Sequence, residues 1–373
     1  MQKVIHSNNV KTALQAMGWT QKELAAQLGV TGQAVTNWMK GTDFPRPDKL
    51  LKLATSLKLS FADLVQLPQA AQPVVAFRKK AGAKTTDAHI VKAMVMGGLL
   101  KGLVPFLPPL PQLRRQMPNP STSYAALQCV VAQVRASLGL TQGAVLQYEN
   151  LLGEFVENGA VVVPVMWGSQ QNHKNALHIL LPEERVTFIL LNLDTYLEDF
   201  KFWMAHELAH VFTPDLAGKE EGEDFADAFA GALLFPMEMA RTVYEKASAG
   251  NKSQECKVLL AYAAEHGISL FSVFSEANRF AHAQGLPPLK HDAHEVHAIR
   301  NAQRGKLVSE LLFAPLPPEP SVYVAAAEKQ FKSPFFQALR QMVKAQQTGP
   351  GYIQQIMDIP MQDAAALHKE MSQ

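Results

Sequence analysis

The chain has 373 residues, of which 47% are hydrophobic and 18% are charged, an ordinary composition for a folded protein of roughly two to three domains. Its formal net charge of +2 excludes a molecule that binds nucleic acid through overall charge, so any basic surface must be local. Its two cysteines, Cys129 and Cys256, exclude a disulfide framework and a zinc ribbon and fit a reducing cytoplasm.

The most apolar stretch, residues 93–107, is interrupted by Lys101 and Pro105. It falls short of the roughly 20 apolar residues that cross a bilayer. The first residues also lack the apolar core of a signal peptide. We therefore expect a soluble, cytoplasmic protein with no membrane partner.

Residues 1–67 show short helical patterns separated by glycines. The predicted helices cover about 8–17, 21–28, 32–40, 47–57 and a short segment after Ser60. Thr20 and Glu23 form a capping box at the second helix. Gly29 permits a sharp turn, after which Thr31 caps the third helix.

This pattern resembles the Xre/Cro-type helix-turn-helix. The residues that carry the resemblance are Thr20-Gln21-Lys22-Glu23-Leu24-Ala25, Gly29-Val30-Thr31, Val35, Trp38 and Gly41. The resemblance implies that helix 32–40 enters the major groove of DNA. The candidate DNA contacts are Gln33, Thr36 and Asn37 at base edges, and Thr31, Gln21 and Lys40 as phosphate or cap contacts.

The local charge agrees with this interpretation. Residues 1–66 contain eight basic and four acidic side chains, a net charge of +4. This is a modest footprint that a homodimer would double on a double-stranded DNA operator. The alternative is a five-helix module that binds protein instead of DNA.

Residues 68–120 are rich in proline and include the basic run Arg78-Lys79-Lys80, which predicts an extended linker interrupted by a helix at 88–100. The pattern then predicts helices and strands in alternation. The helices are expected at 124–138, at 143–157 and from about Thr195, and the strands at 160–167, 176–181 and 186–193. Beyond Pro236 the chain is expected to be mostly helical, with a proline-rich break at 315–320.

The helix expected from Thr195 contains His206-Glu207-Leu208-Ala209-His210. Histidines four residues apart lie on one helix face, so both imidazoles can bind one Zn²⁺ at ~2.0–2.1 Å. Glu207 can deprotonate the activated water and pass the proton to a leaving amine. The alternative is a surface helix with two unrelated histidines, but the flanking residues are apolar nearly all round, which disfavours it.

A tetrahedral catalytic site needs a third protein ligand, and an acid-rich segment opens the next helix. His-Glu-Leu-x-His followed by Glu223-Asp224-Phe225-Ala226-Asp227-Ala228-Phe229-Ala230 and by Leu233-Leu234-Phe235-Pro236 resembles the ImmA/IrrE family of metallopeptidases over about 124–280. The resemblance implies that Glu223 is the third zinc ligand, whereas the residues alone also allow Glu220 or Glu221. Ala209 and Asp227 stand where the family usually has glycine and asparagine.

The expected fold class is α+β. An all-α helix-turn-helix domain at 1–67 precedes the linker at 68–120, a zincin-like (gluzincin) metallopeptidase domain with a small sheet at 121–285, and a helical C-terminal region at 286–373. The expected function is a DNA-binding transcriptional regulator with a zinc-dependent endopeptidase domain. The resemblance implies a repressor or antitoxin-like protein as its substrate in regulated proteolysis.

The alternative function is a DNA-binding repressor whose zinc domain is a non-catalytic sensor or dimerisation module. The intact Glu207 favours the enzyme, because a structural zinc site has no use for a base. His178, Tyr196 and His282 are candidate oxyanion stabilisers, and the sequence does not choose among them. His291, His294 and His297 lack a tetrahedral spacing, and we interpret them as a solvated or partner-facing patch.

Overall fold

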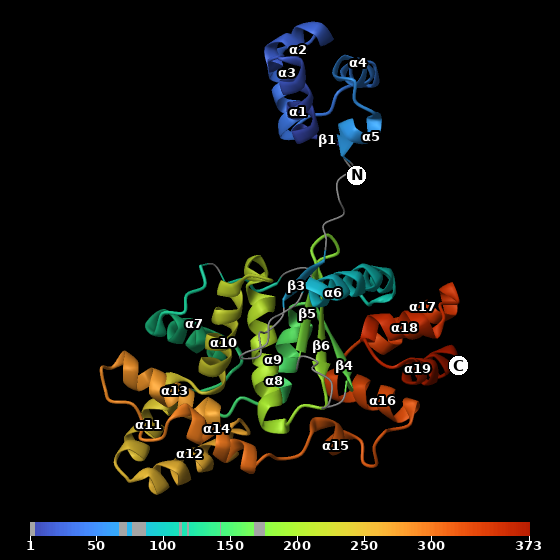
Figure 1. Ribbon diagram of the computed structural model, residues 1–373. Coiled ribbons are helices and arrows are strands. Elements are labelled where there is room, and N and C mark those ends of the chain that lie inside the picture. The colour runs from blue at the N-terminus through green and yellow to red at the C-terminus, as the bar shows by residue number, and fades with distance from the viewer. Residues whose placement is uncertain are drawn as a thin grey trace. The chain divides into compact units, whose positions relative to one another are not determined.

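A computed structural model describes residues 4–66, 73–76, 87–111, 114–117, 119–141, 143–167 and 176–373. The chain divides into two compact units, an N-terminal unit at Met1–Gln72 and a C-terminal unit at Pro73–Gln373. Figure 1 shows the elements of each unit.

The N-terminal unit is a cluster of helices with one two-residue strand pair. Its elements are α1 (Ser7–Met17), α2 (Gln21–Leu28), α3 (Gly32–Lys40), α4 (Pro47–Leu57), α5 (Phe61–Leu64), β1 (Val4–Ile5) and β2 (Val65–Gln66). β1 and β2 are antiparallel and join the two ends of the unit. Apolar side chains from every helix form one core, with Leu24, Leu28 and Leu64 fully buried.

The helix boundaries in this unit follow the local signals in the sequence. Thr20 and Glu23 form the predicted capping box, in which the Thr20 amide donates to the Glu23 carboxylate at 2.7 Å. Gly29 ends α2 with φ of 62°, a left-handed conformation that a side chain would strain. Thr31 then accepts a hydrogen bond from the Ala34 amide at 3.2 Å and caps α3. The predicted boundaries are therefore confirmed.

The C-terminal unit is built on a mixed four-stranded sheet. Its strands are β3 (Val74–Ala76), β4 (Ala160–Val165), β5 (Ala176–Leu181) and β6 (Val186–Asn192), in the order β3-β5-β6-β4. β5 runs antiparallel to both neighbours, and β4 runs parallel to β6. β4 and β6 are buried along their whole length, which explains their largely apolar sequences.

Helices surround the sheet. They are α6 (Asp87–Leu100), α7 (Tyr124–Ser137), α8 (Tyr148–Glu157), α9 (Leu197–Phe212), α10 (Glu220–Leu234), α11 (Met237–Ser248), α12 (Lys252–His266), α13 (Leu270–Ala283), α14 (Ala293–Ala302), α15 (Val308–Leu312), α16 (Pro320–Phe331), α17 (Phe335–Gln346), α18 (Pro350–Met357) and α19 (Met361–Ser372), with 3-10 turns η1 (Lys101–Phe106) and η2 (Pro214–Leu216). α9 packs on β5 and β6 and lies beside α10, as Figure 1 shows. The small mixed sheet and its surrounding helices, together with the helical N-terminal unit, confirm the predicted α+β class.

The segment expected as an extended linker contains a strand and helices where the structure describes it. β3 pairs with β5, and α6 and η1 place Met96, Leu100 and Leu103 in the core of the C-terminal unit. The favourable free energy of burying these apolar side chains outweighs the interruption of regular structure by the prolines, because burial removes apolar surface from water. The basic run at 78–80 lies outside the described residues.

The C-terminal helices cover an edge of the sheet. Tyr323 in α16 donates its hydroxyl proton to the Pro164 carbonyl, and Ser333 donates to the Val162 carbonyl. These bonds satisfy carbonyl groups on the edge of β4 that does not pair with β6. Pro164 has no amide proton to pair there, which suits an edge strand. The region at 286–373 is thus part of the same compact unit as the sheet.

No single helix among the described residues is long and apolar enough to span a membrane. Only α12 and α13 together, which meet at an angle of 113°, have the length and composition to do so.

Candidate metal centre and DNA-binding surface

α9 carries the two histidines and is almost completely buried. Its residues from Trp203 to Phe212 are all inaccessible to solvent or nearly so. The histidines therefore do not belong to a surface helix. Buried imidazoles without partners would be costly, so their surroundings decide what they do.

Glu223 from α10 meets both histidines at short range. His206 Nε2 lies 3.2 Å from His210 Nε2. Glu223 Oε2 lies 3.5 Å from His206 Nε2, and its Oε1 lies 3.3 Å from His210 Nε2. A tetrahedral Zn²⁺ with bonds of ~2.0–2.1 Å separates its ligand atoms by about 3.3–3.4 Å. One donor atom from each of the three residues lies within 4.8 Å of the other two, so the set is close enough to converge on such an ion.

The unsatisfied atoms of the cluster support the same conclusion. Within the described part of the chain, neither carboxylate oxygen of Glu223 has a hydrogen-bond partner, although both are buried. Buried carboxylate oxygens are normally hydrogen-bonded or bound to a cation. Two imidazoles and a carboxylate are also a donor set that zinc accepts, so the residues present fit the metal.

The first turn of α10, which carries Glu223, packs closely on η2 at Gly222. A Cβ atom at Gly222 would lie 2.2 Å from the Leu216 carbonyl oxygen, so only glycine allows η2 to approach the first turn of α10. The two alternative ligands, Glu220 and Glu221, are both exposed. Of the three carboxylates considered from the sequence, the structure brings only Glu223 to the histidines.

Asp227 supports His206 from one turn further along α10. Its Oδ1 accepts a hydrogen bond from His206 Nδ1 at 2.9 Å. This bond fixes the proton on Nδ1 and leaves the Nε2 lone pair facing His210 and Glu223. From the sequence, Asp227 was notable only because the resembled family usually has asparagine at this position. Its spacing of four residues from Glu223, on the same helix face, was the signal for this role.

The electrostatics of the cluster favour a positive charge between the histidines and Glu223. Burial lowers the pKa of His206, but its hydrogen bond with Asp227 and the close approach of the Glu223 carboxylate outweigh burial and raise the pKa to about 9. Burial raises the pKa of Glu223, but contacts with His206 and His210 outweigh it and lower the pKa to about 2. A bound divalent cation would replace the protons as the positive charge.

Glu207 faces a third histidine. Its Oε2 lies 3.5 Å from Nδ1 of His178, which projects from β5. The other two candidate oxyanion stabilisers lie elsewhere. Tyr196 pairs with Leu307 in an isolated bridge, and His282 lines a hollow between α7 and α13. Of the three candidates, the structure brings only His178 to Glu207.

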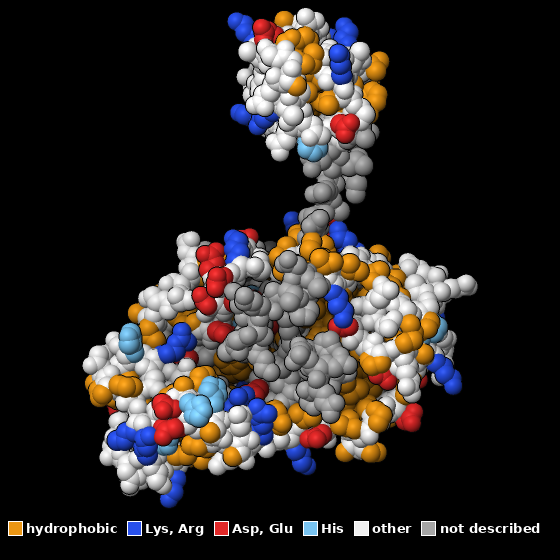
Figure 2. All heavy atoms as spheres, viewed as in Figure 1, with side chains coloured by type: hydrophobic (Ala, Val, Ile, Leu, Met, Phe, Trp, Pro, Cys, Tyr) orange, Lys and Arg blue, Asp and Glu red, His pale blue; other side chains and the backbone are white. Residues whose placement is uncertain are grey.

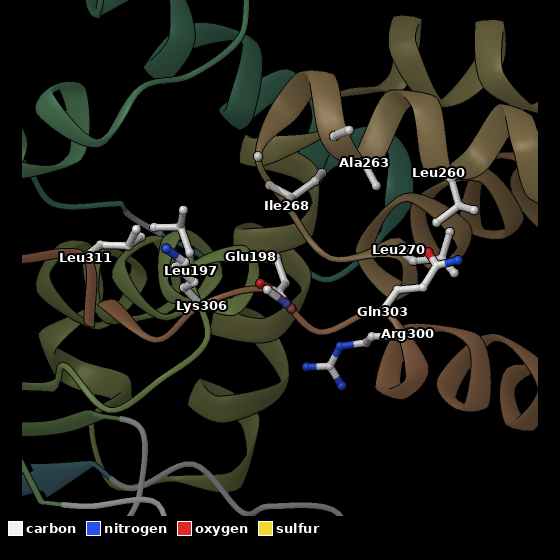
Figure 3. A pocket seen from close by; sticks show the side chains of 13 residues that line it. Leu197, Glu198, Leu260, Ala263, Ile268, Leu270, Arg300, Gln303, Lys306 and Leu311 are labelled. Atoms are coloured by element: carbon white, nitrogen blue, oxygen red, sulfur yellow. Dashed lines mark hydrogen bonds between the residues drawn. The ribbon is translucent and has the colours of Figure 1, made fainter. Parts of the chain in front are cut away.

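A hollow of about 410 Å³ lies away from this cluster. Figure 3 shows Leu197 and Glu198 of α9 opposite Ile268 and Arg300 at its wall. None of His206, Glu207, His210 and Glu223 lines it. The first turn of α9 is about 14 Å along the helix axis from the histidines, so this hollow is not the candidate metal centre.

Two of the three histidines of the 291–297 segment have structural contacts. His291 Nδ1 lies 2.8 Å from Glu255 Oε1, and the His297 ring stacks on Phe271 at 4.2 Å between centroids. Among the described residues, the one set of three potential metal-binding groups is His206, His210 and Glu223.

The predicted DNA contacts lie on or near α3 of the N-terminal unit. Gln21, Thr31, Gln33 and Lys40 are exposed, and Thr36 and Asn37 are half-buried. Gln33 donates to Asn37 Oδ1 at 2.9 Å, which orients both amides on the outer face of α3. Thr36 instead donates to the Gly32 carbonyl at 3.0 Å. Basic side chains occupy several places on the visible face of this unit, as Figure 2 shows.

The fold and site together define a class of protein, a DNA-binding regulator with a metallopeptidase-like domain. Residues 10–64 match the helix-turn-helix family, and residues 163–273 match the IrrE N-terminal-like domain family. The chain therefore combines an Xre-type helix-turn-helix with an ImmA/IrrE-like peptidase domain, as the sequence resemblances implied. Neither the curated proteins nor the solved structures gave a significant match.

Proposed function

We propose that the protein is a cytoplasmic transcriptional regulator whose C-terminal unit is a zinc-dependent endopeptidase. His206, His210 and Glu223 hold Zn²⁺, and Glu207 is the general base. The observation that carries this proposal is the set of spacings from 3.2 to 3.5 Å among donor atoms from α9 and α10. The family match over 163–273 supports it independently.

The chain's own residues supply the proton transfers of amide hydrolysis. Zinc, when bound, supplies Lewis-acid activation of water and of the scissile carbonyl. Glu207 then takes the water proton on its carboxylate and delivers it to the leaving amine. Asp227 keeps the proton on His206 Nδ1 throughout, because it accepts that hydrogen bond.

The N-terminal unit directs this activity to DNA. A homodimer would present two α3 helices to successive major grooves of an operator. The substrate is a repressor or antitoxin-like protein, as the family resemblance implies. The helix-turn-helix either brings the peptidase to a DNA-bound repressor or is itself the repressor.

The peptidase is tested with wild type, Glu207→Gln and the control Glu221→Gln, which changes an exposed carboxylate on α10. We expect all three to bind about one zinc per chain. Wild type and the control should cleave the cognate repressor, whereas Glu207→Gln should not. Equal cleavage by all three would remove Glu207 as the base. Zinc binding without cleavage by any of them would support the non-catalytic zinc module.

DNA recognition is tested at Asn37. Asn37→Ala should weaken operator binding by about 1–3 kcal/mol if this amide reads a base. Gln27→Ala, an exposed change on α2, is the control. Lys40→Ala should weaken binding to all sequences alike and reduce the salt dependence, because it contacts phosphate. Unchanged operator affinity in Asn37→Ala would remove it from the recognition set.

A further inference from the structure

His178 is a buried polar residue in an otherwise apolar strand. Its side chain is 1% exposed, and its strand neighbours Leu177 and Ile179 are buried hydrophobic residues. Burying an imidazole without hydrogen bonds is costly, whereas a leucine or valine would pack there at no such cost. The position therefore needs a reason beyond the packing of the sheet.

The polar group that His178 faces is Glu207. His178 Nδ1 and Glu207 Oε2 are 3.5 Å apart, and within the described residues neither atom has a hydrogen-bond partner. The distance exceeds that of a good hydrogen bond, about 2.7–3.2 Å. Hydrogen bonds at catalytic sites are often long before substrate binds, so a donor and an acceptor left facing each other fit a bond that shortens in the loaded site.

The backbone around His178 is held rigidly. β5 is paired on both sides, with Ala76 of β3 opposite His178 on one side and Ile189 of β6 on the other. The His178 ring also lies beside His210, with centroids 5.5 Å apart. The Glu207 carboxylate, in contrast, lies at the end of a side chain with several rotatable bonds on α9. A donor fixed in the sheet can therefore select one orientation of the Glu207 carboxylate.

We propose that His178 is a positioning residue for Glu207. Its Nδ1–H donates to Glu207 Oε2 and holds the carboxylate in the orientation from which the carboxylate can take the water proton. This inference rests on the proposed role of Glu207 as general base. His178 itself neither binds the metal nor transfers a proton in this assignment.

The first test compares His178→Leu, His178→Asn and Ile179→Val in the full chain loaded with zinc. Leucine removes the donor, asparagine restores a donor near the place of Nδ1, and Ile179→Val alters the packing of the same strand without removing a polar group. We expect kcat to fall about 10–100-fold in His178→Leu, with KM and zinc content unchanged. His178→Asn should recover most of this loss, and Ile179→Val should behave as wild type. Wild-type kcat in His178→Leu, or no recovery in His178→Asn, would overturn the proposal.

The second test does not depend on proteolysis. Nitrogen-15 labelling of the histidines, with His178→Asn to assign the signal, reveals which ring nitrogen of His178 carries the proton. We expect a protonated Nδ1 whose resonance shifts in Glu207→Gln. A bare Nδ1, or a resonance that Glu207→Gln leaves unchanged, would contradict the contact.

The two tests separate this inference from the proposed function. A protonated Nδ1 that responds to Glu207→Gln, in a wild-type protein that cleaves no repressor, would support the contact and defeat the peptidase. Cleavage that requires Glu207 but is equally fast in His178→Leu would uphold the peptidase and overturn the role of His178.

Discussion

The two units of this protein place their functional residues in opposite ways. In the N-terminal unit, the predicted DNA contacts other than Gln21 of α2 lie within α3 or at its N-cap, and Thr31 and Gly41 mark both ends of that helix. In the C-terminal unit, α9 and α10 have N-cap residues, Tyr196 and Lys219, that form no side-chain cap. These two helices are instead stabilised by packing against each other, and α9 also packs against the sheet.

This difference teaches where each function is vulnerable. The predicted DNA-binding surface lies mainly on α3, whose ends are set by local capping residues, so it requires little more than the formation of that helix. A centre assembled from α9, α10 and β5 exists only when all three are packed, because each of these elements supplies only some of its residues. Changes that disturb long-range contacts should therefore affect the metal centre and leave the N-terminal unit intact.

The largest expected effect is the loss of a metal ligand. Structural zinc sites bind with about 10–16 kcal/mol over four ligands, so each ligand contributes about 2.5–4 kcal/mol. Glu223→Ala should therefore weaken zinc binding by about 100–1000-fold, measured by competition with a chelator. Glu221→Ala is the control, since this side chain is 67% exposed. Similar zinc affinity in the two variants would show that another group completes the site.

A buried arginine tests the dependence of the C-terminal unit on long-range contacts. Arg135 in α7 is 3% exposed and donates to the carbonyls of Leu233 at 2.8 Å and Thr141 at 3.3 Å. Arg135→Met would leave these buried acceptors unsatisfied and should destabilise the C-terminal unit by about 3 kcal/mol. The measurement is thermal unfolding, with the exposed Arg241→Met as control. Equal destabilisation of the N-terminal unit would contradict the independence of the two units.

A buried carboxyl should make the stability of the C-terminal unit depend on pH. Burial of Glu276 raises its pKa to about 7, and nearby Arg279 offsets only part of this shift. Between the unfolded value near 4.5 and pH 7, the folded protein keeps a proton that the unfolded chain has lost. The Glu276 contribution to stability is therefore fully present below pH 4.5 and is lost as the pH rises through 7, by about 3 kcal/mol.

Denaturant unfolding at several pH values measures this effect. Glu276→Gln cannot ionise and should flatten the dependence between pH 5 and 7. A slope unchanged from wild type would assign the pH dependence to other groups.

The smallest expected effect lies in the N-terminal unit. Thr20→Ala removes the capping box of α2 and should destabilise this unit by about 1 kcal/mol. The change should leave zinc affinity unaffected, because the cap is a local contact. Gln27→Ala, on the exposed face of the same helix, is the matched control for unfolding. A loss of zinc in Thr20→Ala would break the contrast between the units.

The sequence predicted part of the C-terminal unit as well as the N-terminal unit. β5 was located at 176–181, and β4 and β6 to within two residues of their ends, because buried strands have unbroken apolar runs between turn residues. The helix predicted at 143–157 is α8, and in the structure it starts only at Tyr148, where the Gln147 amide donates to Asn150 Oδ1 at 2.9 Å.

The sequence by itself determined the helices of the N-terminal unit and the two histidines of the candidate metal centre. Both depend on short-range information, namely caps and glycines in one case and two histidines a helical turn apart in the other. Only the tertiary structure decided that Glu223 and not Glu221 meets the histidines, that Asp227 orients His206, and that His178 faces Glu207. These choices depend on how α10 and β5 pack on α9, and packing joins residues whose separation in the chain carries no periodic signal.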